Sequence, residues 1–324
     1  MTRAARCGDV MATLVPSKVD STNGVFLNVL SVPARLYDPA FDSYLLRKPG
    51  GGENHTLTLA LKIHLKQAAM YGMKQFVHLD ANKRMWVIDE WSVSDWTHFK
   101  RKFHQQCLRW NDHFWLTPPP GYSKLDVKVG ARTVRPNIYC HLYVELTGGP
   151  AGAHREIEVA NLDIAFARAH ARQGQKLDSG TSRSDEADYD SLDVTARDNW
   201  SQDGSGAWVR HVNYLTIVHE IGHAIGLPHI GESHKDPLCS AAILAGDNPA
   251  LEGTAVGALF KGKGNSLACY GQFMPNLRSN NVMGMGTQFD ETNAQPWVDR
   301  IAYHTQTKAN DWTVSMQRVK PKVV

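Results

Sequence analysis

The chain has 324 residues, of which 42% are hydrophobic and 21% are charged, and its formal net charge is +3. This composition is that of a globular protein with ample material for a core, in one large domain or two modest ones. The small net charge and the shortness of the basic clusters, Lys100–Lys102 and Arg318–Lys322, argue against a nucleic-acid partner, and no apolar run reaches the roughly 18 residues that a membrane span needs.

The sequence leaves the cellular location open. No apolar region of signal-peptide length follows Met1–Asp9, so we expect a cytoplasmic protein or export by a non-classical route. The 5 cysteines form neither a dense disulfide framework nor a zinc ribbon. Cys239 and Cys269 bracket a Gly/Ala-rich stretch and could form a loop bridge, whereas Cys107 and Cys140 are interpreted as small buried apolar residues.

The first predicted element of the fold follows a glycine-rich break. Residues 1–54, which close on Pro49–Gly52, are interpreted as an N-terminal extension. From His55 to Lys66, polar and apolar residues alternate, which predicts a strand with one apolar face. Residues Trp86–Trp91 predict a second strand.

A long amphipathic helix is predicted next. Ser94 or Asp95 can cap its start, and the run Pro118–Gly121 is expected to stop it. Its apolar residues recur at helical spacing: Trp96, Phe99, Phe103, Cys107 and Trp110.

Several shorter strands are predicted between this helix and the middle of the chain, at residues 125–129, 138–146, 157–159 and 191–196. The acidic loop Asp185–Asp190 offers oxygen ligands that could hold calcium, but it lacks the ordered spacing of an EF-hand, so a solvated loop is the favoured interpretation. Another helix is predicted to begin near Asn213.

That helix carries the most informative motif of the chain, since residues 219–229 read His-Glu-Ile-Gly-His-Ala-Ile-Gly-Leu-Pro-His. Positions four apart lie on one helix face, so His219 and His223 can direct ring nitrogens at a common point roughly 2 Å from each. Glu220 lies one step round the helix, outside this ligand set but within reach of a water on the metal. The alternative is an ordinary polar helix face, because the chain has 15 histidines.

The end of the motif explains how a third ligand could reach the same point. Gly226 can adopt a positive φ at little cost, and Pro228 prevents the helix from resuming, so His229 can swing back. Three neutral imidazoles would leave the fourth position of a tetrahedral zinc ion to water, whose pKa the metal lowers toward neutrality. Such an open position indicates catalysis, not a structural site.

The motif matches HExxHxxGxxH at every fixed position, so the chain resembles the metzincin clan of zinc endopeptidases. That clan also carries a downstream turn whose methionine forms an apolar floor under the three imidazoles. Asn281–Gly286 resembles this turn, with Met283 rather than Met285 as the floor residue. The resemblance covers only the motif and this short turn.

The resemblance implies an α+β fold with the zinc ion in a cleft between two subdomains. The upper one, residues 55–226, would hold a twisted, mostly parallel sheet with long helices and end in the zinc-binding helix. The lower one, residues 227–324, would be irregular, with loops over 240–265 and a closing helix at Pro296–Thr305. The predicted order of strand, long helix, strands and metal-binding helix agrees with this fold.

Two departures from the family pattern leave the group that stabilises the oxyanion unassigned. Ile230 follows the third histidine, a position that differs between subfamilies, and Met285 stands where some subfamilies place a tyrosine. Tyr270 and Tyr303 flank the turn in sequence and are candidates, although core or rim packing is the simpler interpretation of each.

The resemblance implies an endopeptidase with one catalytic Zn²⁺ that acts on a protein or peptide. Glu220 would deprotonate the attacking water and return the proton to the leaving amine. The extended substrate could add to an edge strand of the sheet. A chain of this kind without a signal peptide or an obvious inhibitory pro-segment resembles bacterial toxins that dedicated machinery exports, for which a cognate inhibitor is expected; cell-wall peptides are an alternative substrate.

The rival hypothesis is an inactive binding or structural protein that keeps zinc to stabilise its fold. Structural zinc sites usually close all four positions with protein ligands, often cysteines, and no cysteine lies in the motif. His234 is the nearby residue that could fill the fourth position. The intact Glu220 argues against this hypothesis.

Overall fold

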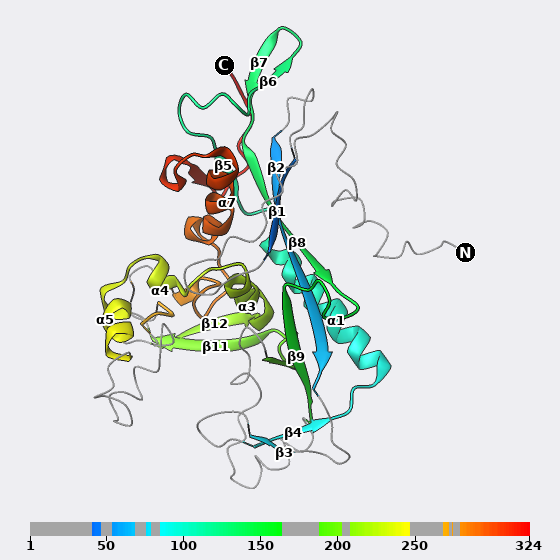
Figure 1. Cartoon of the computed structure of the whole chain (residues 1–324). Helices are drawn as coiled ribbons and strands as arrows, with labels where there is room; N and C mark the ends of the chain where they lie inside the picture. The colour runs from blue at the N-terminus through cyan, green and yellow to red at the C-terminus, as the bar shows by residue number, and fades with distance from the viewer. Residues whose placement is uncertain are drawn as a thin grey trace.

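A nine-stranded mixed sheet forms the main body of the chain (Figure 1), with strand order β13-β5-β8-β2-β9-β4-β3, β1 beside β2 and β10 beside β9. The computed structural model describes residues 41–46, 54–68, 76–78, 85–163, 188–202, 208–246, 268–271, 274 and 279–324. Within these, the strands of the sheet are β1 Asp42–Leu46, β2 His55–Gln67, β3 Phe76–His78, β4 Met85–Asp89, β5 Trp115–Thr117, β8 Ile138–Leu146, β9 Arg155–Leu162, β10 Asp188–Asp190 and β13 Thr313–Ser315.

The sheet is mixed, so the expectation of a mostly parallel sheet is wrong. Only three of its eight pairings are parallel, and they join β8 to β2, β2 to β9 and β9 to β10. The other five are antiparallel, because short strands from local hairpins and from the chain ends add at the edges. One of them is β1, which pairs with β2 through Asp42↔Ala60, so part of the predicted extension 1–54 belongs to the sheet.

Helix α1, Val93–Cys107, packs against the sheet and confirms the predicted amphipathic helix. Its cap is Ser92, whose hydroxyl accepts the Asp95 N–H at 3.1 Å, so the predicted cap at Ser94 or Asp95 is wrong by a few residues. The helix also ends well before Pro118. It passes through the short 3-10 helix η1, Leu108–Trp110, and Asn111 then leaves the helix, because its side chain exchanges hydrogen bonds of 3.1 and 2.7 Å with the backbone of Leu142.

The strand predicted at 191–196 is wrong, since that segment is a turn directly after β10. The carboxylates of Asp190 and Asp193 cause the turn. Asp193 accepts the Asp190 N–H at 2.8 Å, and Asp190 accepts the Leu192 N–H at 2.7 Å. Local bonds of this kind compete with the hydrogen-bond ladder of a strand.

Two smaller sheets lie beside the main one. The first pairs β11, Arg197–Gln202, with β12, Trp208–Tyr214, and the second has the order β14-β7-β6, from Lys322–Val323, Arg132–Arg135 and Val127–Val129. The predicted strand 125–129 corresponds to β6, and the predicted strands 138–146 and 157–159 are confirmed as β8 and as part of β9.

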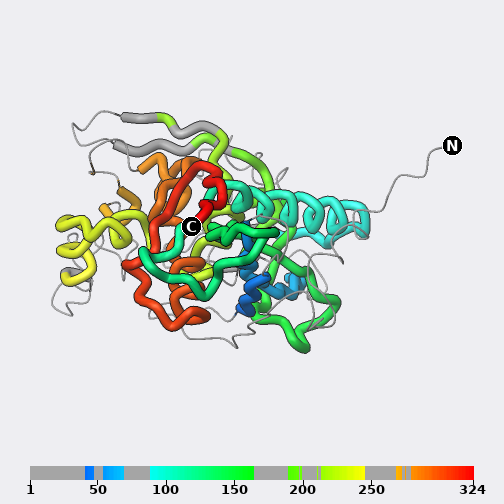
Figure 2. Tube along the Cα trace, turned by 90° about the horizontal axis from the view of Figure 1, so that it is seen from above, coloured from blue at the N-terminus to red at the C-terminus, as the bar shows by residue number. Residues whose placement is uncertain are grey.

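Among the described residues, the remaining helices are shorter than α1 and follow β12. They are α3 Thr216–Ala224, α4 Ile230–Ser233, α5 Pro237–Gly246, η4 Glu291–Ala294, α7 Gln295–Thr305 and η5 Ala309–Asp311. Helix α3 starts after Asn213, a residue of β12 whose φ is 60°. Helix α7 confirms the predicted closing helix. Residues 240–246, expected as a loop, are helical in α5, and 247–265 lie outside the described residues. Seen from above, α5 and α1 lie on opposite sides of the molecule (Figure 2).

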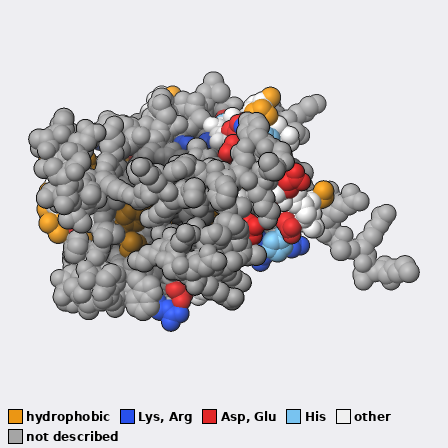
Figure 3. Space-filling view, turned by 90° about the horizontal axis from the view of Figure 1, so that it is seen from below, with side chains coloured by type: hydrophobic (Ala, Val, Ile, Leu, Met, Phe, Trp, Pro, Cys, Tyr) orange, Lys and Arg blue, Asp and Glu red, His pale blue; other side chains and the backbone are white. Residues whose placement is uncertain are grey.

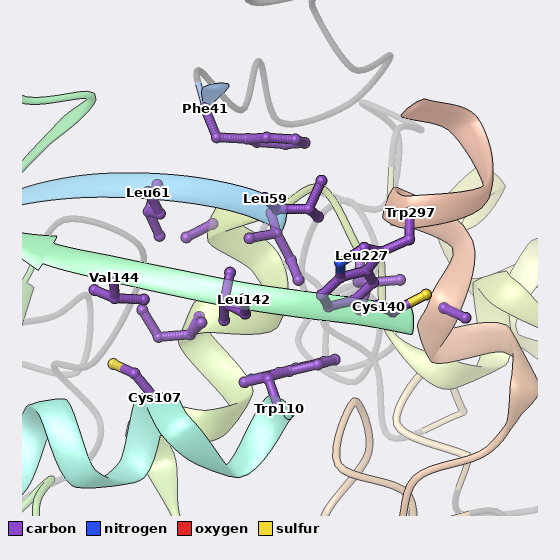
Figure 4. Close-up of a cluster of buried hydrophobic side chains, with 14 of the residues drawn as sticks. Phe41, Leu59, Leu61, Cys107, Trp110, Cys140, Leu142, Val144, Leu227 and Trp297 are labelled. Atoms are coloured by element: carbon purple, nitrogen blue, oxygen red, sulfur yellow. The ribbon is translucent and has the colours of Figure 1, made fainter. Parts of the chain in front are cut away.

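The core lies where β2 and β8 meet α1, α3 and α7. Trp110, Trp297, Leu59 and Leu61 are at most 1% exposed. Figure 4 shows these side chains converging from the helix α1 end, the two strands and α7, with Cys107, Cys140 and Leu227 among them. The buried side chains of α3 belong to the same core cluster as those of β2, β8, α1 and α7. Burial of these apolar side chains therefore holds α3 on the sheet.

The described surface has ordinary mixed charge. Figure 3, from below, shows acidic, basic and histidine side chains near one another, and Lys66 makes an exposed ion pair with Glu156 at 3.6 Å. Among the described helices, none combines the length and apolar character required to cross a membrane.

Candidate metal centre

Helix α3 carries the first half of the candidate site and is buried along its whole length. Its apolar residues Ile217 and Ile221 join the core, and the Trp110 indole donates a hydrogen bond of 3.0 Å to the Val218 carbonyl. The helix is therefore held on the side away from the site, while His219 and His223 lie four positions apart on its other side.

The chain reverses at Gly226 as the sequence predicts. Gly226 has φ 97°, its N–H donates to the His223 carbonyl at 2.8 Å, and the Leu227 N–H donates to the Gly222 carbonyl at 2.9 Å. These two bonds form a Schellman motif, which requires a left-handed residue at this position. His229 is the N-cap residue directly before α4, and its carbonyl accepts the Glu232 N–H at 3.0 Å.

The three histidines predicted as metal ligands converge on one point. The Nε2 atom of His223 lies 3.1 Å from that of His219 and 3.2 Å from that of His229. A tetrahedral ion with metal–nitrogen bonds of roughly 2.1 Å has ligand nitrogens roughly 3.4 Å apart, so the spacing is close to that of a tetrahedral metal site. Among the described residues, this is the cluster of His, Cys, Asp or Glu side chains that could hold a metal ion.

The hydrogen bonds of the rings indicate which of their nitrogens could bind a cation. His219 Nδ1 lies 2.8 Å from the Val282 carbonyl, and His223 Nδ1 lies 2.7 Å from the Leu227 carbonyl. A carbonyl only accepts, so each Nδ1 carries the proton and each Nε2 of a neutral ring presents a lone pair. Burial lowers the pKa of His223 to about 4, which keeps that ring neutral near pH 7. Converging lone pairs repel one another unless a cation lies between them.

Glu220, the predicted general base, is 7% exposed in the middle of α3. Burial raises the pKa of the Tyr189 hydroxyl in β10, and the negative charge of Glu220 raises it further. Glu220 therefore lies close enough to Tyr189 for its charge to act on that hydroxyl. Arg155 of β9 opposes that rise and also lowers the pKa of His223. The carboxylate thus lies within the electrostatic reach of strands β9 and β10.

Met283, the predicted floor residue, is fully buried against α3. Its sulfur packs so closely on Gly222 that a Cβ there would collide with it, and the same Cβ would approach the Trp110 ring to 3.0 Å. The Met283 carbonyl accepts the Ile230 N–H at 3.0 Å, so the turn is also tied to the residue after His229. A glycine within the motif helix was the sequence signal for this close approach.

The turn around Met283 is held by an asparagine pair. Asn281 accepts the Met283 N–H at 2.8 Å and donates to Asn293 at 3.0 Å, and Asn293 in turn accepts the Asp290 N–H at 2.9 Å. The sequence analysis missed Asn293, because nothing near the motif indicates that η4 reaches the turn.

Of the two tyrosine candidates, Tyr270 lies at the site. Its ring centre is 3.9 Å from that of His229 and 5.8 Å from that of His219. Tyr303 is 58% exposed on α7, and within the described residues it makes no ring contact with the three histidines. The disulfide that the sequence left open is present: Cys269, next to Tyr270, is bonded to Cys239 of α5, and Cys107 and Cys140 are free and buried.

Two other possible metal ligands were considered from the sequence, His234 and the acidic loop 185–190. His234, the candidate fourth ligand, is 3.2 Å from the Asp290 carboxylate. In the acidic loop 185–190, residues 185–187 lie outside the described part of the chain, and the Asp190 carboxylate accepts a backbone N–H.

A small pocket opens between α3 and the chain around Met283, and neither Glu220 nor any of the three histidines is among its lining residues. It was not foreseen from the sequence. Two of its lining residues are linked to His219. Val218 precedes His219 in the chain, and the Val282 carbonyl lies 2.8 Å from His219 Nδ1. The lining residues are Arg109, Leu215, Val218, Val282, Gly286, Thr287 and Phe289.

Comparison of the chain with protein-family models, with curated proteins and with solved structures gave no match. The chemistry of the site therefore has to be argued from its own residues.

Proposed function

We propose that this chain is a zinc-dependent endopeptidase of the metzincin type. The observation that carries the proposal is the convergence of the three Nε2 atoms at 3.1 and 3.2 Å, one residue away from the buried Glu220. Neutral imidazoles leave the charge of a dication undiminished, and a donor set of three histidines is typical of catalytic zinc. With His234 bonded to Asp290, a fourth protein ligand from that residue is disfavoured.

The residues of the site divide the work of hydrolysis between them. A bound zinc ion would polarise the scissile carbonyl and lower the pKa of a nearby water. Glu220 takes one proton from the attacking water, whose oxygen forms a bond to the carbonyl carbon. The C–N bond then breaks, and Glu220 returns the proton to the leaving nitrogen. His219 and His223 stay oriented because their Nδ1 protons are bound to carbonyls.

The decisive experiment compares the wild type with Glu220→Gln. The wild type is expected to bind one zinc per chain and to cleave peptides, with activity lost to a chelator and restored by zinc. The variant should keep its zinc, measured by mass spectrometry of the metal, and lose turnover by about 10³-fold or more. An unchanged rate in the variant contradicts the assigned role of Glu220.

The substrate class is tested in the same assay. A protein-derived peptide pool and purified cell-wall peptides are offered side by side to the wild type, with Glu220→Gln as the control for each. Cleavage of the wall peptides alone would replace the endopeptidase with a wall peptidase. Zinc bound with no cleavage of either pool would favour the structural role.

A further inference from the structure

Tyr270 occupies a distinct side of the metal centre. Its ring lies over His229, at 3.9 Å and 39°, and runs nearly parallel to His219, at 5.8 Å and 10°. Within the described residues, no ring contact joins Tyr270 to His223. The Tyr270 ring therefore lies beside two of the three ligands, and the residue is only half-buried. A group in this position is next to the reacting atoms without belonging to the His219–Glu220–His223 helix.

Two contacts hold the backbone around Tyr270 against both sides of the site. The Cys269 carbonyl accepts the Gly231 N–H at 2.7 Å, two residues after His229. On the other side, a Cβ at Gly284 would come within 2.7 Å of the Tyr270 carbonyl, so the methionine turn packs directly on this residue.

A covalent bond adds a third restraint. Cys269 is buried and bonded to Cys239 of α5, 30 residues earlier. The chain between them includes residues 247–267, for which no structure is described. The disulfide ties Cys269, and with it the neighbouring Tyr270, to α5.

We propose that Tyr270 is a catalytic residue whose hydroxyl donates a hydrogen bond to the carbonyl oxygen as it gains negative charge, and that the Cys239–Cys269 disulfide positions it. This inference rests on the proposed peptidase function. The phenol keeps its proton throughout, so the proton balance stays with Glu220 and the leaving nitrogen. A preorganised donor at a developing oxyanion is worth roughly 10²-fold in kcat.

The first test is Tyr270→Phe, which removes one oxygen and keeps the ring on His229. We expect kcat to fall roughly 100-fold with KM little changed. Affinity for a phosphinic peptide, which imitates the tetrahedral intermediate, should fall by a similar factor in calorimetry. Zinc affinity, measured by competition with a chelator, should stay within about 3-fold. Tyr303→Phe, on the exposed face of α7, is the matched control and should behave as wild type.

The outcomes separate the two levels of the argument. A wild type that binds zinc but cleaves no peptide contradicts the peptidase function, and the role of Tyr270 falls with it. An active wild type whose Tyr270→Phe variant keeps its kcat contradicts only the role of Tyr270. A variant whose main loss is in zinc affinity shows a structural support for His229 instead.

The second test concerns the disulfide. Cys239→Ser with Cys269→Ser should lose kcat and phosphinic-peptide affinity to about the same extent as Tyr270→Phe, with zinc still bound. Combining the three substitutions should add little, because residues that act as one unit are not additive. A mild reductant should reproduce the loss in the wild type and leave the double serine variant unchanged. Fully additive losses would overturn the positioning role of the disulfide.

Discussion

The two halves of the metal centre are built in different ways. Helix α3 supplies His219, Glu220 and His223 from nine continuous buried residues. The opposite half is assembled from three separate segments around His229, Tyr270 and Met283, which meet through backbone contacts. The helix sets its residues by local spacing, whereas the other half depends on residues far apart in the chain.

The irregular half is held together where glycines let backbones touch. A Cβ at Gly231 would come within 2.7–2.9 Å of the backbone of Ala268 and Cys269, and one at Gly284 would meet three carbonyl oxygens at 2.7–3.3 Å. Such contacts leave no room for a side chain. The irregular half should therefore be the more fragile of the two.

The largest effect is expected from removing His229, the candidate ligand that the irregular half contributes to the site. His229→Ala leaves the two imidazoles of α3 without their third partner, so zinc affinity should fall by at least about 100-fold, since even changes to groups that only orient a ligand cost 10- to 100-fold. Competition with a chelator measures the loss. His234→Ala is the control, because that ring is bonded to Asp290, and it should keep one zinc per chain. Equal zinc affinities in the two variants would refute the ligand assignment.

A second prediction tests the fragility of the irregular half. Gly231→Ala forces a methyl group against backbone atoms that have little freedom to move, so the free energy of unfolding should fall by about 3 kcal/mol. Gly148→Ala is the matched control, because nothing lies within 4 Å of a Cβ there. Thermal melts of the zinc-loaded proteins make the comparison. A Gly231→Ala melt as high as that of the control would contradict the close packing.

The features of the site that could be predicted from the sequence are local ones and belong mainly to the helical half. The spacing of His219 and His223 and the positive φ of Gly226 are local properties, and both were predicted. Periodicity likewise located β2, β8 and α7. The strand expected at 191–196 failed because Asp190 and Asp193 bind the backbone, and that competition is not visible in an apolar pattern.

The rest depends on contacts between distant residues. The pairing of Cys239 with Cys269 could be suggested from their positions, but the placement of Tyr270 over His229 required knowing which way the chain returns. The pocket with Arg109 joins η1 to α3 and to the chain after Met283, three segments with no shared sequence signal. Edge strands such as β1 are equally hidden, because antiparallel additions need only short segments.

A third prediction measures how strongly the halves are coupled. Gly222→Ala on α3 meets the flexible end of Met283 and the rim of Trp110, so it should cost less than Gly231→Ala, about 1–2 kcal/mol. Met283→Ala creates a cavity and is destabilising alone. In the double variant the new methyl group partly fills that cavity, so the combined loss should be smaller than the sum. Chemical denaturation of the four proteins gives the coupling energy, and strict additivity would mean that the turn does not pack on α3.

The smallest effect is expected from His304, which lies outside both halves of the site. His304 of α7 lies with its Nε2 2.9 Å from the Ser43 hydroxyl, and burial, together with the charge of Arg300, lowers its pKa to about 4. The unfolded chain, with an ordinary histidine pKa near 6.5, takes up a proton that the folded chain refuses, so this contribution is complete above pH ~6.5 and is lost as the pH falls toward 4. Because the ring is only partly buried, solvent screening limits the loss to on the order of 1 kcal/mol.

His304→Gln should remove this dependence while keeping a polar group near Ser43. Between pH 7 and 4.5, the melting temperature of the metal-free wild type should therefore fall roughly 1–2 °C further than that of the variant. The protonation of the three ligand histidines is common to both metal-free proteins and cancels in the comparison. Parallel pH profiles would contradict the role of His304 as an acid-sensitive group.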